Sequence, residues 1–133
     1  MAKKISEFSK YVVKKRINAK LSYQDVADAV GVSRPYIYDI EKGNNKPPID
    51  YQKLDGWATV LGLRKRSREL LFDKAVEERD EVPADIKKEI LENDRIKKVI
   101  RKCINGDLPK QLWDSVLESV STTTEEDVND DEE

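Results

Sequence analysis

The segment Leu21–Gly43 constrains the fold most strongly, because it predicts two short amphipathic helices joined by one tight turn. Ser22 can cap the first helix, and Asp25 follows three residues later, as in a capping box. Gly31 supplies the left-handed backbone conformation that ends this helix. Ser33 can cap the second helix. The segment therefore predicts a compact two-helix corner.

Small and branched apolar residues converge on this corner. Ala27 is small at the point where the two helices should cross, and Pro35 falls in the first turn of the second helix, where it is tolerated. An ordinary helical hairpin would share some of these features, but the two serine caps and a basic flank favour a nucleic-acid-binding corner. The other converging residues are Val26, Val30, Val32, Ile37 and Ile40.

The charge is divided unevenly along the 133 residues, although the net charge is only −2. Residues 1–68 hold 15 Lys and Arg against 7 Asp and Glu, and residues 69–133 hold 10 against 20. A basic N-terminal half indicates a polyanionic partner. The segment 121–133 contains seven acids and no base, and it predicts a disordered acidic tail.

The remaining pattern is helical, which predicts an all-α chain. A first helix is expected over Phe8–Asn18, with Tyr11, Val12 and Ile17 on its buried face. Breaks near residues 79–83 predict three units: a domain over 1–79, a helical segment over 84–120 and the tail. Further helices are expected after Asp50, stopping at Gly62; after Ser67; over Ala84–Glu92; from Asn93 or Asp94 to Gly106; and from Asp107, with Pro109 in the first turn, to about Val120.

Residues 8–63 resemble the lambda-repressor/Cro-like helix-turn-helix family, also called the xenobiotic-response-element type. The resemblance implies a five-helix bundle that binds operator DNA as a homodimer, with residues 33–42 in the major groove, and a transcriptional regulator, expected to be a repressor. It rests on Leu21-Ser-Tyr-Gln-Asp-Val-Ala, Val30-Gly-Val-Ser, Tyr36-Ile-Tyr-Asp-Ile-Glu-Lys-Gly43 and Trp57-Ala-Thr-Val-Leu-Gly-Leu63.

The family resemblance assigns base contacts to the start of the second corner helix. Ser33 and Arg34 fall where relatives reach bases or a phosphate, and Arg34 could bond guanine in a bidentate manner. Pro35 replaces a frequent polar contact residue, so van der Waals contacts are expected there. Asp39 departs from the usual amide or small residue, and it could accept from cytosine or orient Arg34.

Phosphate contacts are expected around this helix, and they should dominate the affinity and make it salt-sensitive. A helix N-terminus also favours a phosphate. For Tyr36, simple packing is an equal alternative. The candidates are Ser22, Tyr23, Gln24, Tyr36, Tyr38, Asn44 and Lys46.

Arg16 and Glu41 match a pair that forms a salt bridge between the first and third helices in relatives. The resemblance therefore implies a structural role for both residues, and a substitution of either should lower stability before specificity. Arg16 could also approach a phosphate.

Two apolar stripes follow beyond residue 84, and so short a segment needs a partner surface. A homodimer is the first expectation, while the N-terminal domain and a different protein are alternatives. Cys103 lies within the first stripe and is expected to be a small packing residue. The stripes comprise Ile96, Val99, Ile100, Cys103 and Ile104, then Leu112, Trp113, Val116, Leu117 and Val120.

The sequence predicts a DNA-binding protein that is not an enzyme. It has no histidine, no nucleophile beside a base, no phosphate loop and no metal-ligand cluster, so neither cofactor nor metal is expected. One cysteine and no long apolar run predict a cytoplasmic, non-membrane protein. An antitoxin that blocks a partner protein through residues 84–120 is the main alternative, and a regulator of a mobile element is another.

Overall fold

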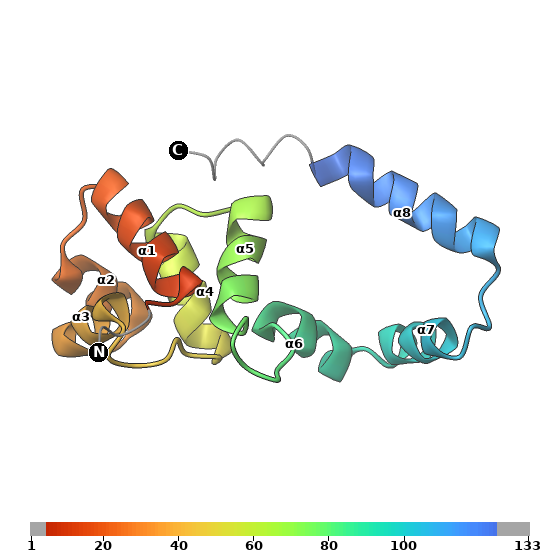
Figure 1. Cartoon of the computed structure of the whole chain (residues 1–133), viewed down its shortest axis with the longest axis horizontal. Coiled ribbons are helices and arrows are strands. Elements are labelled where there is room, and N and C mark those ends of the chain that lie inside the picture. The colour runs from red at the N-terminus through yellow and green to blue at the C-terminus, as the bar shows by residue number, and fades with distance from the viewer. Residues whose placement is uncertain (1–4, 125–133) are drawn as a thin grey trace.

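A computed structural model describes residues 5–124, and every regular element in this range is an α-helix, as the sequence predicted. Figure 1 shows α1 to α5 gathered into a bundle, from which α6 leads to α7 and α8. The helices are α1 (Glu7–Asn18), α2 (Tyr23–Val30), α3 (Arg34–Lys42), α4 (Tyr51–Val60), α5 (Arg66–Ala75), α6 (Ala84–Glu92), α7 (Asp94–Ile104) and α8 (Lys110–Thr124).

The bundle surrounds one apolar core to which every helix from α1 to α5 contributes. Phe8 of α1 and Trp57 of α4 are fully buried and meet edge to face, with ring centroids 5.4 Å apart. Such contacts add stability beyond the buried area alone. Every predicted corner residue except the partly buried Val32 is buried, so α2 and α3 are fixed to this core.

The predicted turn chemistry is confirmed at both corner helices. Ser22 and Asp25 form the reciprocal capping box of α2, and Gly31 ends the helix at φ 85°. The hydroxyl of Ser33 accepts from the backbone N–H of Tyr36 at the start of α3. The carboxylate of Asp50 likewise caps α4. These local bonds set the start of each helix independently of the core.

The prediction that Ile17 lies on the buried face of α1 is wrong, and α5 begins slightly earlier than expected. Ile17 is 57% exposed, and the buried face of α1 instead includes Ser9, whose hydroxyl donates to the backbone carbonyl of Ile40. α5 begins at Arg66, directly before Ser67, at which the start of the helix was expected. The Ser67 hydroxyl bonds the backbone of Arg64, and its carbonyl accepts from Tyr11 at 2.9 Å. A pattern of neighbouring residues in the sequence cannot predict hydrogen bonds that join a side chain to another backbone segment.

The C-terminal helices have a different relation to the bundle. α6 contacts α4 and α5, and Ala84 at its start is buried. α7 contacts α6, whereas α8 packs closely against no other helix of the described range. α8 begins at Lys110 and continues to Thr124, past the end expected near Val120. The rest of the predicted tail, residues 125–133, lies outside the described residues.

Candidate nucleic-acid interface

Three long side chains form a ridge along α3. Arg34, Tyr38 and Lys42 recur every fourth residue, so they lie on one side of the helix. All three are exposed to solvent, in contrast to the buried Ile37 and Ile40 on the opposite side. The ridge therefore combines two cations and one aromatic ring on a helix that the core holds rigidly.

The ring of Tyr23, from α2, connects the ridge to the rest of the corner. It meets Tyr38 edge to face, with centroids 5.7 Å apart. The guanidinium carbon of Arg16 lies 4.4 Å from the Tyr23 centroid, and that of Arg34 lies 6.0 Å away. The ammonium of Lys42 is 5.5 Å from the Tyr38 centroid. Cation–π contacts of this kind are worth about 0.5–1 kcal/mol at exposed sites.

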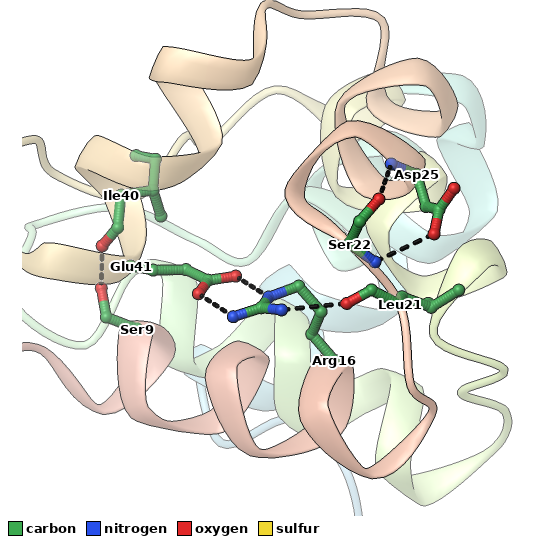
Figure 2. A network of polar contacts seen from close by, with 7 residues as sticks. All are labelled: Ser9, Arg16, Leu21, Ser22, Asp25, Ile40 and Glu41. Carbon is green, nitrogen blue, oxygen red and sulfur yellow. Dashed lines mark hydrogen bonds and ion pairs between the residues drawn. The ribbon is translucent and has the colours of Figure 1, made fainter.

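Arg16 and Glu41 form the predicted bridge between α1 and α3 (Figure 2). Nε of Arg16 donates to Glu41 at 2.7 Å and Nη2 donates at 2.9 Å, while Nη1 donates to the carbonyl of Leu21 at 2.9 Å. Glu41 is only 4% exposed. The hydrogen bond to Glu41 raises the pKa of Arg16 above its ordinary value, although burial acts in the opposite direction. One guanidinium thus ties together α1, the start of α2 and α3.

Asp39 does not orient Arg34, as had been one prediction, because its carboxylate takes a different partner. The side-chain amide of Asn44 donates to Asp39 at 3.3 Å, and the Asn44 backbone N–H donates to the Asp39 carbonyl at 2.8 Å. These bonds close the turn after α3 around Gly43, at φ 80°. The acid at position 39 thereby shapes the loop that carries two candidate phosphate contacts.

That loop is also held from the far side by a residue at the predicted domain boundary. Nη2 of Arg79 donates to the carbonyl of Pro47 at 2.7 Å, and Pro47 is buried. Lys46 is exposed beside this anchor. The loop is therefore fixed at Asn44 by Asp39 and at Pro47 by Arg79, with Lys46 between the two.

The remaining candidate contacts lie at or near the starts of α2 and α3. Ser22, Gln24, Ser33 and Pro35 are exposed, and the side-chain amide of Gln24 donates to Asp28 at 2.8 Å. Tyr36 differs, because it is half-buried and packs against the core. Burial raises the pKa of its hydroxyl, and the charge of Asp50 acts in the same direction. This environment favours the packing alternative for Tyr36.

Sequence reasoning omitted Lys42 from the candidate site. The signal was present, since Lys42 follows Arg34 and Tyr38 at the same helical spacing. It was obscured because Lys42 also fits the basic last turn that favours any helix C-terminus.

The described range also lacks two features that other functions would require. Residues 5–124 contain no group of three or more acidic or Cys side chains placed to hold a metal ion. No helix within the described range is both long and apolar enough to cross a membrane.

Comparison with known proteins gives one family match and one relative. A family model described as a helix-turn-helix matches residues 12–65, which span most of α1 through α4. A UPF0122 protein of Clostridium novyi (strain NT) is 33% identical over 72 residues, which is 54% of this chain. The match covers 57% of that relative, so this chain spans little more than half of its length. No solved structure matches the chain.

Proposed function

We propose that this chain is a sequence-specific transcriptional regulator that inserts α3 into the major groove of DNA. Its residues 12–65 match a helix-turn-helix family model of the lambda-repressor/Cro-like type. The observation that carries the proposal is the exposed ridge of Arg34, Tyr38 and Lys42 on a helix whose opposite face is buried. Such a helix can enter a groove without disturbing the core, because its packing uses other residues.

In this arrangement the residues divide between two tasks. Arg34, on the first turn of α3, is the base-reading candidate, since a guanidinium can donate to guanine O6 and N7 together. Ser33 and Pro35 would lie against the neighbouring base edges. Phosphate contacts would come from Lys42 and Lys46, with Ser22, Tyr23, Gln24, Tyr38 and Asn44 completing the set.

We further propose that the protein acts as a homodimer and represses transcription from the site it binds. Two copies would present two α3 helices about 34 Å apart, which is one turn of DNA, and would recognise a palindrome. Repression follows if that site overlaps a promoter. A DNA partner implies a cytoplasmic location, and no cofactor or metal takes part in this proposal.

An antitoxin function is the second candidate, because α7 and α8 expose apolar side chains that a partner protein could cover. Under that proposal residues 84–120 would block a toxin while α3 regulates the shared promoter. A small toxin-like reading frame beside the gene would favour it, and co-purification of the two products would establish it.

The direct test is DNA selection from a random library with the full-length protein. We expect enrichment of a palindromic motif, with half-sites spaced by about one helical turn. A single half-site would support base reading by α3 and contradict the dimer. No enriched motif would contradict sequence-specific regulation, including the repressor proposal.

A further inference from the structure

α7 and α8 carry apolar side chains that remain exposed to solvent in the described range. On α7 the apolar residues occupy one side and five cations occupy the other, yet none of its residues is buried. Val99 is 52% exposed and Ile104 is 76% exposed. On α8, Leu112, Trp113, Val116 and Leu117 are each about half exposed. These two sets form the α7 stripe and the α8 stripe, and both remain exposed among residues 5–119 of one copy.

Helices of this length do not hold their shape alone. Isolated helices of fewer than about 12–15 residues are marginal in water, and α7 has 11 residues while α8 has 15. α7 gains support from α6 at one end, and α8 contacts no helix closely among the described residues. In Figure 1 α8 turns away from α7 after the connecting loop and the two helices do not lie side by side. The described helices of one copy therefore leave the exposed part of both stripes without a covering surface.

Charge indicates that the covering surface is another copy of the same chain. Residues 94–104 carry five Lys and Arg against one acid. Residues 110–133 carry one Lys against nine acids. One chain thus contains both a basic amphipathic helix and an acidic segment that includes an amphipathic helix. A two-fold axis would place the basic helix of each copy near the acidic segment of the other while the apolar stripes meet, since the same patches face each other on both subunits.

We infer that α7 of one copy packs its apolar stripe against the α8 stripe of a second copy, and that this exchange forms the dimer. The inference rests on the proposed function in one respect, because the exchange would supply the contact between the two subunits of the proposed DNA-binding dimer. It places the interface beyond α6, away from the α3 ridge. Cys103, as a half-buried member of the α7 stripe, would lie in this contact.

The first experiment measures mass in solution by light scattering with Val116→Lys. Ser115→Lys is the matched control, because it adds the same charge on the polar side of the same helix. We expect the wild type and S115K to be dimers and V116K to be a monomer, each with an unchanged melting temperature for the bundle. A wild-type monomer at tens of micromolar, or a V116K dimer, would overturn the inference.

The second experiment identifies the helices that meet. One preparation keeps Cys103, and the other carries Cys103→Ser with a single new cysteine at Leu112, Val116 or Leu117. After mixing and mild oxidation, a disulfide between α7 and α8 can form only between copies. We expect a covalent heterodimer for at least one position and none for Ser115→Cys. A third preparation keeps Cys103 and carries the new cysteine in the same chain. If a disulfide forms only within that chain, α8 folds back on its own α7 and the inference fails.

These outcomes are separable from those of the proposed function. If V116K is a monomer but still binds a half-site duplex, α3 recognition stands independently of the interface. If the dimer forms as described and no DNA motif is selected, the interface stands and the regulatory proposal fails.

Discussion

Replacing Gly56 with alanine should destabilise the bundle, although helix propensity alone predicts the opposite. Gly56 lies within α4 at its closest approach to α2. A Cβ atom at this position would stand 2.6 Å from the carbonyl oxygen of Ala29 and 3.0 Å from the Cα of Val30. Both neighbours are backbone atoms, so no side chain can rotate to make room.

The magnitude follows from two opposing terms. Alanine in a helix interior is favoured over glycine by about 1 kcal/mol. An ordinary contact between carbon and a carbonyl oxygen is about 3.3 Å or longer, so α2 would have to retreat by roughly 0.7 Å. Overpacking of this kind costs about 1–3 kcal/mol, and a clash between two backbones belongs near the upper end. We expect a net loss of about 2 kcal/mol, or a melting temperature lower by about 8–16 °C.

Circular dichroism at 222 nm during heating and urea titration would measure this loss. Thr59→Ala is the control, because Thr59 is exposed on the same helix and its replacement tests propensity without contact. We expect Thr59→Ala to raise stability by a few tenths of a kcal/mol. A Gly56→Ala variant as stable as the wild type, or more stable, would refute the close-packing argument.

Three further predictions concern the corner and α6. Glu41→Ala should cost about 3–5 kcal/mol of unfolding free energy because it leaves the partly buried guanidinium of Arg16 without its partner. The Arg16→Met/Glu41→Leu double variant should recover most of that loss in urea titrations, and equal losses would contradict the pairing. Tyr23→Leu should reduce the preference for selected over scrambled DNA by about two- to fivefold, because Arg34 loses its aromatic neighbour. Tyr23→Phe keeps the ring and should leave the preference unchanged. Anisotropy titrations would measure both variants. Burial raises the pKa of Asp85, so the folded state favours the protonated carboxyl group. The free energy of unfolding should therefore fall as the pH rises from the ordinary carboxyl range through the raised pKa. Asp85→Asn should flatten this pH dependence in urea titrations, and an unchanged pH dependence would contradict the role of Asp85.

Features that depend on adjacent residues could be predicted from the sequence. The capping box at Ser22 and Asp25 requires only a spacing of three residues, and the turn at Gly31 requires only a residue that tolerates positive φ. The Arg16–Glu41 bridge was predicted from the family resemblance, because its two residues lie 25 positions apart and have no local signature.

Features that depend on which backbone segments meet could not be predicted in this way. Ser9 and Ser67 bond to distant or irregular backbone, so their burial depends on the completed bundle. Gly56 is required by a neighbouring helix rather than by its own. The partner of Asp39 was missed because the turn after α3 brings Asn44 back to it. In each case the deciding contact is created by tertiary structure.

Base reading by Arg34 on α3 can be measured by comparing two substitutions on two DNA duplexes. Fluorescence anisotropy would titrate the wild type, Arg34→Ala and Lys46→Ala against a selected duplex and a scrambled one. We expect Arg34→Ala to lose about 5- to 150-fold in affinity for the selected duplex and little for the scrambled one. Lys46→Ala should weaken both equally and reduce the salt dependence by about one phosphate. Equal losses on both duplexes for Arg34→Ala would show that Arg34 contacts phosphates rather than a base.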